Sequence, residues 1–276
     1  MTIWEIIKKI LLFIVIILIG LIFLFPIVWI LMASFKTRVQ NFALPPLFVF
    51  VPTIENYVDL LQSENPNFSM NYLNSFAIAI TSTVISVALG SMAAYGFSRY
   101  TIKGGEFLFG WILSLRFFPI VAMVIPMYVL FTAVGLRDTH LALILVYMIF
   151  NISFTIWFLK GFFDEIPQSL EEAARLDGYR PFQVFYKVSI PLVWPGIITA
   201  AIFCLIQSLN EFLIALALTS RTAVTAPVAL AKLQTAVGPD WGKMAAAAML
   251  LVIPVLIFTI IVRNQIIRGM SFGQLK

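Results

Sequence analysis

Residues 10–35 form the longest apolar stretch of the chain and read ILLFIVIILIGLIFLFPIVWILMASF, with no charged side chain. A helix needs about 20 apolar residues to cross the hydrocarbon core of a bilayer. The stretch also exceeds the apolar core of roughly 7–15 residues that is typical of cleaved signal peptides. We therefore expect an uncleaved membrane span that follows Lys8 and Lys9.

The composition of the whole chain points the same way. Hydrophobic residues make up 61% of the 276 residues and charged residues only 11%, with a mean hydropathy of +1.00. Soluble domains use about 45–50% apolar and about 25% charged residues, so a soluble protein is excluded. The net charge of +5 comes from basic residues scattered singly between apolar runs. This pattern favours membrane topology and contact with lipid headgroups over binding of nucleic acid.

Six stretches are long and apolar enough to span a membrane, which predicts an all-α membrane protein with about six transmembrane helices in a single domain of residues 1–276. The predicted spans are 10–32, 73–97, 107–131, 141–162, 196–218 and 245–262. With the N-terminus inside, the inner segments hold eleven Lys and Arg residues and the outer loops hold six. Basic residues concentrate on the cytoplasmic side, so both termini are expected in the cytoplasm. Residues 33–72 are then a folded external loop.

Small residues and prolines indicate how the spans pack. Gly90 and Ala94 have the spacing that lets two helices approach closely. Pro119 and Pro126 in the third span and Pro254 in the sixth are expected to kink or break their helices. Broken helices at membrane depth often border a cavity, although any one proline can simply shape packing.

The inner loop 163–191 lies within the sequence GFFDEIPQSLEEAARLDG (161–178) and YRPFQVFYKVSIP (179–191). Ser169 and Glu172 have the spacing of a capping box, which predicts the start of a short helix. Gly178 supplies the left-handed residue that ends a helix. Pro181 suits the first turn of a second helix, which is expected to end near Pro191. The loop is therefore predicted to be a helix–Gly–helix elbow in the cytoplasm.

Glu172-Ala173-Ala174, followed by Gly178 and then by VSIP at 188–191, resembles the EAA loop of permeases of binding-protein-dependent ABC importers. The resemblance covers nearly the whole chain, which looks like the second permease of maltose/trehalose-type carbohydrate importers. Further matching stretches are AAYGFSR at 93–99, RFFP at 116–119, NEFL at 210–213, and GMSFG at 269–273 with Lys276. Leu209, where the family usually has Trp, and Gln274-Leu275 in the tail depart from the pattern.

The resemblance implies a type I ABC importer permease fold in the cell membrane of a prokaryote. It implies pairing with a homologous second permease, an ABC ATPase dimer and an extracytoplasmic solute-binding protein. ATP and magnesium would bind the ATPase, and this chain, which has no P-loop, would carry no cofactor and be no enzyme. The elbow residues implied to contact the ATPase are Ser169, Leu170, Glu171, Glu172, Ala173, Ala174, Arg175, Leu176, Asp177 and Gly178.

Four polar residues lie within the predicted spans and are candidates for the substrate path. Arg116 either lines the path or pairs with a neighbouring helix, because a charge at this depth needs a cavity or a partner. Gln207, Asn210 and Glu211 have i, i+3, i+4 spacing and are expected to form one polar face. Amide and carboxylate groups suit the hydroxyls of a sugar, so we favour a face that lines a cavity.

The sequence therefore favours a subunit that forms half of the path for a carbohydrate, expected to be a di- or oligosaccharide. Import of a polyol or of glycerol phosphate is an alternative, with Arg116 as the anion partner. An ATP-independent carrier would leave the elbow without a purpose. A membrane-embedded enzyme needs convergent catalytic groups, and this chain offers one histidine, His140, in a predicted loop.

Overall fold

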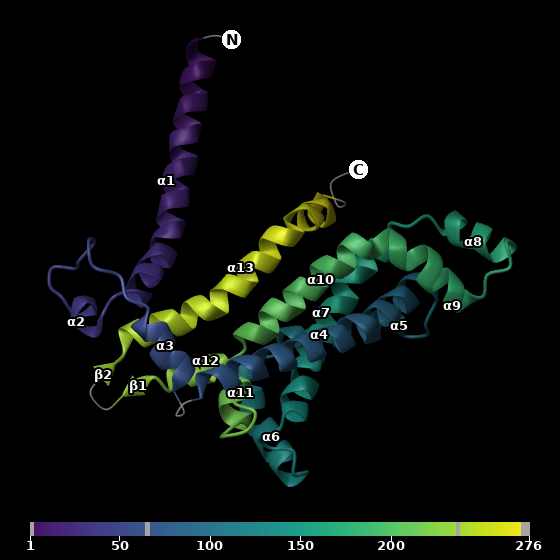
Figure 1. The fold of residues 1–276 in the computed structure, drawn as a ribbon. Helices are drawn as coiled ribbons and strands as arrows, with labels where there is room; N and C mark the ends of the chain where they lie inside the picture. Colours follow the sequence, from purple (N-terminus) through teal and green to yellow (C-terminus); the bar gives the residue numbers. More distant parts are fainter. Residues whose placement is uncertain (1–2, 64–66, 236–237, 272–276) are drawn as a thin grey trace. The chain divides into compact units, whose positions relative to one another are not determined.

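The computed structural model describes residues 3–63, 67–235 and 238–271, and these divide into two compact units. Unit 1 comprises Met1–Ser69 and Leu230–Ile253, and unit 2 comprises Met70–Ala229 and Pro254–Lys276. Figure 1 labels the elements along the chain. Phe272, Gly273, Gln274, Leu275 and Lys276 of the predicted tail motif lie outside the described residues.

The described residues are mainly helical, as the composition predicts. The elements begin with α1 (Ile3–Ser34), α2 (Arg38–Asn41), α3 (Glu55–Gln62), α4 (Phe68–Arg99), α5 (Gly105–Phe117), α6 (Ile120–Ala133) and α7 (His140–Asp164). They continue with α8 (Gln168–Leu176), α9 (Pro181–Val184), the π-helical turn η1 (Phe185–Ser189), α10 (Ile190–Asn210), α11 (Leu213–Leu218), α12 (Ala226–Ala231) and α13 (Trp241–Ser271). A two-stranded antiparallel ladder pairs β1 (Gln234–Thr235) with β2 (Gly238–Pro239).

Five single helices of the described chain are long and apolar enough to cross a membrane, and the bent pair α5 and α6 supplies a sixth crossing. The two helices meet at 94° beside Pro119, which has no N–H to continue a helix. Ser98 lies 2.6 Å from the Oδ1 atom of Asp164, so the end of α4 is beside the end of α7. Since α6 leads to Thr139, which caps the start of α7, the pair connects opposite ends of α7. About six spans are thus confirmed, with the third one broken.

The core of unit 2 is built by α4, α7 and α10, whose buried apolar side chains pack in one cluster. Gly90 allows this packing: a Cβ atom there would lie 2.6 Å from the Cβ of Thr155, so any side chain would push α4 from α7. Cys204 of α10 lies within 3.5 Å of the Thr155 hydroxyl on the same contact. The small-residue spacing around Gly90 therefore marks a close helix contact, as membrane helices require.

In unit 1, the end of α1 is fixed by polar side chains of α3. The Asn56 amide donates hydrogen bonds of 2.8 Å to the carbonyls of Ser34 and Lys36, and Tyr57 donates to the Ser34 hydroxyl. Asp59 of α3 pairs with Lys243 of α13 at 3.0 Å. Within the predicted loop 33–72, residues 34–62 are thus a folded segment attached to α1 and α13.

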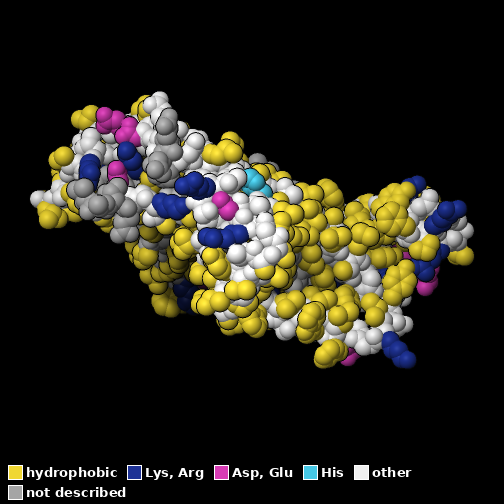
Figure 2. Space-filling view, turned by 90° about the horizontal axis from the view of Figure 1, so that it is seen from below, with side chains coloured by type: hydrophobic (Ala, Val, Ile, Leu, Met, Phe, Trp, Pro, Cys, Tyr) yellow, Lys and Arg dark blue, Asp and Glu magenta, His cyan; other side chains and the backbone are white. Residues whose placement is uncertain are grey.

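The surface is largely apolar. None of the best membrane window of α1 is buried within the chain, although its hydropathy is the highest of the spans. Figure 2 shows hydrophobic side chains over much of the face that it draws. Lipid or another membrane helix must cover such a surface, because water would leave it unfavourably exposed.

Candidate functional site

The inner loop forms the expected elbow, with one local correction at its start. Helix α8 begins at Gln168 behind Pro167, which makes no side-chain cap, so the predicted capping box of Ser169 and Glu172 is absent. Proline has a fixed φ and no N–H group that would need a partner at the start of a helix. Pro167 can therefore precede α8 without a side-chain cap. Gly178 follows α8 with a φ of +87°, as its left-handed role predicts.

The second half of the elbow differs from the prediction that a helix ends near Pro191. Pro181 occupies the first turn of α9 as expected, but the chain then continues through η1 into α10 without a break. The π-helical turn shifts the hydrogen-bond register just before Pro191, and the Ser189 hydroxyl also contacts the carbonyl of Val184 at 3.4 Å. A proline can therefore stand at the start of α10 without ending the helix.

Two neighbouring glutamates of α8 differ in burial. Glu171 is 2% exposed and Ala174 is also buried, whereas Glu172 and Ala173 are exposed. The other exposed residues of the predicted coupling segment are Ser169, Leu170, Arg175, Leu176, Asp177 and Gly178. The elbow thus presents Glu172 and Ala173 outward and attaches to its own chain through Glu171 and Ala174.

The attachment is a buried network of four side chains, here called the Glu171 network: Tyr95, Arg99, Glu171 and Ser189. Arg99 Nε lies 2.9 Å from Glu171 Oε1, with both side chains at most 5% exposed. Ser189 donates to the same oxygen at 2.9 Å, and Tyr95 donates to Oε2 at 3.0 Å. A buried carboxylate is tolerated only when paired and hydrogen-bonded in this way.

The network joins α8 to two membrane helices. Arg99 is the last residue of α4, and it also donates to the carbonyl of Ile166 at 3.1 Å, just before α8. Ser189 is the last residue of η1 and directly precedes α10. Sequence reasoning missed Tyr95, Arg99 and Ser189 as site residues, although Arg99 lies in a stretch that matched the family and is a charge at the end of a span.

Arg116 lies in the last turn of α5, immediately before the break at Pro119. Its guanidinium lies 4.5 Å from the centre of the Phe154 ring on α7. The Nη1 atom is buried without a hydrogen-bond partner among the described residues. The helix dipole favours a cation there, but the buried Nη1 group still lacks an acceptor.

Glu211 is not part of one helical face with Gln207 and Asn210, which corrects the predicted polar face. Helix α10 ends at Asn210, and α11 begins at Leu213. Glu211 lies in the break, where its carboxylate accepts the backbone N–H groups of Ile214 and Ala215 at 2.8 and 3.0 Å. These N–H groups have no partner within the first turn of α11, so the carboxylate satisfies them.

The side chain of Glu211 is hydrogen-bonded within its own chain, unlike those of the other candidate path residues. The Tyr147 hydroxyl donates to Glu211 at 3.1 Å, so that carboxylate is used by its own chain. Gln207 is half-buried and Asn210 is exposed, and among the described residues neither side chain makes a hydrogen bond. Arg116 and Glu211 form no ion pair with each other. Arg116, Gln207 and Asn210 therefore retain free donors or acceptors.

Residues 86–268 match the profile of the binding-protein-dependent transport system inner membrane component. The chain belongs to this family. The match includes the whole elbow, the broken third span and all four candidate path residues. The family and the described helices together establish a multi-pass membrane permease of the ABC importer class.

Individual relatives cover almost the full chain. The trehalose transport system permease protein SugB of Mycobacterium tuberculosis (strain CDC 1551 / Oshkosh) is 38% identical, with 92% of each chain covered. The trehalose/maltose transport system permease protein MalG of Thermococcus litoralis (strain ATCC 51850 / DSM 5473 / JCM 8560 / NS-C) is 32% identical over 99% of this chain and 98% of its own. A chain of a bacterial ABC transporter that imports the acidic polysaccharide alginate superposes with a TM-score of 0.77 at 23% identity, covering 96% of this chain and 98% of that one. The last comparison concerns the fold, and it confirms the ABC importer permease architecture.

Proposed function

We propose that this permease is the membrane-spanning subunit of an ATP-driven carbohydrate importer and couples ATP hydrolysis on a partner to solute movement. The exposed face of α8 carries the proposal, because Glu172 and Ala173 are free while Glu171 fixes the helix to α4 and α10. A helix that serves only as a connection does not need a buried ion pair to one span and a buried hydrogen bond beside another. The relatives named for trehalose and maltose support a di- or oligosaccharide as the solute.

The proposed assembly contains a homologous second permease, an ABC ATPase dimer that binds ATP and magnesium, and an extracytoplasmic solute-binding protein. This chain contains no P-loop, so ATP would act through the partner. The exposed residues from Ser169 to Gly178 would enter a groove of the ATPase, where Ala173 leaves room for close approach. With the bent pair α5 and α6 as one crossing the span number is even, which together with the positive-inside count supports both termini in the cytoplasm. The source organisms of the relatives support a prokaryotic cell membrane.

The proposed solute path uses the polar groups that the fold leaves free. Gln207 and Asn210 lie at the end of α10, and their amides can both donate to and accept from sugar hydroxyls. Glu211 would act indirectly, because its contacts with Ile214 and Ala215 stabilise the break that ends α10. Arg116 stands at the other break, between α5 and α6.

Two glutamates of the elbow allow a matched test of the ATPase contact. Glu172→Ala should reduce recovery of the ATPase in a mild-detergent pull-down, while Glu165→Ala should not. Both side chains are exposed, but Glu165 follows α7 and precedes α8. Equal ATPase recovery with both variants would refute docking through this face of α8. Recovery of the chain without any ATPase or second permease would refute the importer itself.

A second candidate is import of an anionic solute such as glycerol phosphate, and the unpaired guanidinium of Arg116 favours it. A phosphate would satisfy the donors that lack acceptors among the described residues. Arg116→Gln distinguishes the two solutes in reconstituted vesicles. If Arg116→Gln abolishes the stimulation of ATP hydrolysis only for phosphorylated solutes, the anionic solute is favoured. If it reduces stimulation by a neutral disaccharide equally, the sugar is favoured.

A further inference from the structure

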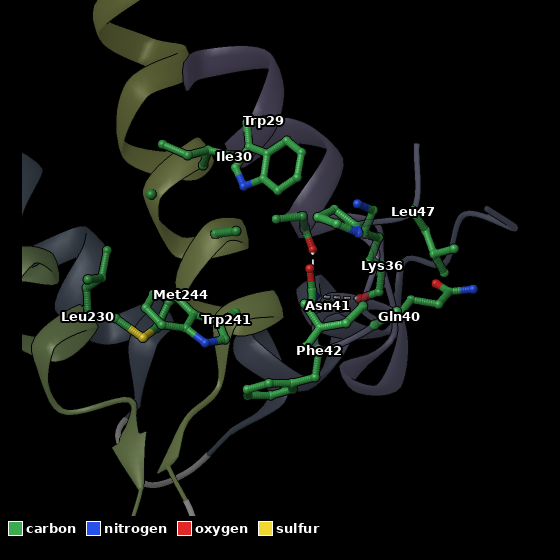
Figure 3. A pocket seen from close by; sticks show the side chains of 16 residues that line it. Trp29, Ile30, Lys36, Gln40, Asn41, Phe42, Leu47, Leu230, Trp241 and Met244 are labelled. Atoms are coloured by element: carbon green, nitrogen blue, oxygen red, sulfur yellow. Dashed lines mark hydrogen bonds between the residues drawn. The ribbon is translucent and has the colours of Figure 1, made fainter. Parts of the chain in front are cut away.

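Unit 1 contains a cavity of about 640 Å³ between the end of α1, the segment 40–47 and the beginning of α13. Figure 3 shows Trp29 and Ile30 of α1 facing this space, with Met244 and Trp241 contributed by α13. Lys36 also lines it, and we call the space the Lys36 cavity. Its walls are mostly apolar, which suits a hydrocarbon chain.

Lys36 brings an uncompensated charge to this cavity. The residue is 3% exposed, and its ammonium lies 5.0 Å from the ring centres of both Trp29 and Phe50. Among the described residues it forms no salt bridge, and no Asp or Glu lines the cavity. Aromatic rings attract a cation, but a buried charge still favours an anionic partner.

The cavity has a polar end at the expected edge of the hydrocarbon core and an apolar end deeper within it. Lys36 directly follows the apolar run 10–35, so it lies where the hydrocarbon core ends. Gln40 and Asn41 line the cavity next to it in sequence. Trp29 is seven residues earlier on α1, about 10 Å deeper at 1.5 Å per residue. On α13 the lining continues from Trp241 to Ala248, an equal distance along that helix.

We propose that the Lys36 cavity binds an anionic phospholipid, with its phosphate at Lys36 and one acyl chain between α1 and α13. The charge calls for an anion, and the apolar walls call for a chain attached to it. A free phosphate would leave the walls of Ile30 and Ala248 uncovered, and an uncharged lipid would leave Lys36 unpaired. This site is separate from the elbow and from the proposed solute path, so it holds whichever solute is imported.

The test uses the intact transporter in nanodiscs that contain equal parts of phosphatidylcholine and phosphatidylglycerol. Lipids that remain after detergent washing are counted by native mass spectrometry. Lys36→Gln should lower the retained phosphatidylglycerol by about fivefold, the discrimination expected for one basic residue near an anionic headgroup. The matched control is Lys232→Gln, an exposed lysine in the same unit that does not line the cavity, which should change nothing.

Ala248→Phe tests the apolar end, because it fills the space between α1 and α13 without touching the charge. It should reduce retention of both lipids. A photo-crosslinking benzoylphenylalanine in place of Met244 covers the case in which the substituted complexes fail to assemble, and it should yield a lipid adduct. Unchanged retention in Lys36→Gln, equal loss in Lys232→Gln, or an adduct with the second permease instead of lipid would overturn the proposal.

Discussion

Replacing Glu171 with alanine removes the acceptor that three side chains share. Arg99, Tyr95 and Ser189 all donate to this carboxylate, at 2.9, 3.0 and 2.9 Å. Arg99 would stay almost completely buried without its counter-charge. Breaking such a pair by removing one partner costs about 3–5 kcal/mol. We expect this cost to appear as easier detachment of α8, because the network is what attaches α8 to α4 and η1.

The magnitude can be measured by hydrogen exchange of the α8 amides in the assembled transporter. If the free energy of local opening of α8 falls by about 3 kcal/mol, its amides should exchange roughly 150-fold faster. The control is Lys160→Ala, which breaks an exposed i, i+4 pair with Asp164 at 2.7 Å near the same loop. Exposed pairs of this kind contribute about 0.3–0.5 kcal/mol, so exchange should change by about twofold.

The double variant Arg99→Met with Glu171→Met separates the loss of the pair from the burial of an unpaired charge. It leaves no buried ion, so it should destabilise α8 less than Glu171→Ala alone. ATP-driven transport should likewise be higher in the double variant than in Glu171→Ala. Exchange of the α8 amides within twofold of the wild type in Glu171→Ala would refute the claim that this network holds the elbow.

Three other substitutions test separate features. Gly90→Val should destabilise the packing of α4 on α7 by about 1–3 kcal/mol, because its Cβ would lie 2.6 Å from Thr155. Thermal unfolding in detergent measures this loss. The control Gly110→Val should show none, because a Cβ at Gly110 would meet no atom within 4 Å. Gly178→Val forces a side chain into a φ of +87° at a cost of about 1–2 kcal/mol, and transport should fall while membrane insertion persists; normal transport would show that the turn is unnecessary. For Asp138, burial raises the pKa of the carboxyl, but the backbone N–H groups of residues 220–223 outweigh this and hold the pKa well below its usual range. The folded pKa is depressed, so this contact should stabilise the loop fully at neutral pH and be lost only on acidification below about pH 4. Asp138→Asn should remove that acid dependence in pH-resolved unfolding, and an unchanged acid limb would contradict the assignment.

The spans could be predicted from the sequence because each depends on local apolar length, and the break at Pro119 follows from the chemistry of one residue. The burial of the Glu171 side chain could not be predicted in this way. Glu171 and Glu172 are adjacent and identical in type, and the choice between them is made by Arg99 from a distant part of the chain. Glu211 is similar, since the break between α10 and α11 contains neither Gly nor Pro to announce it. The buried side of α8 is thus decided by a contact between distant segments, whereas the missed break at Glu211 is stabilised locally by Ile214 and Ala215.

The Glu171 network also limits how permeases of this kind can be recombined. An elbow grafted from a relative brings its own residue to position 171, but the matching cation belongs to α4 and the hydroxyl to η1, just before α10. A graft of residues 163–178 alone would pair a foreign side chain with Arg99 and leave one of them buried without a partner. A functional chimera should therefore exchange positions 95, 99 and 189 together with the elbow, as a single inherited set.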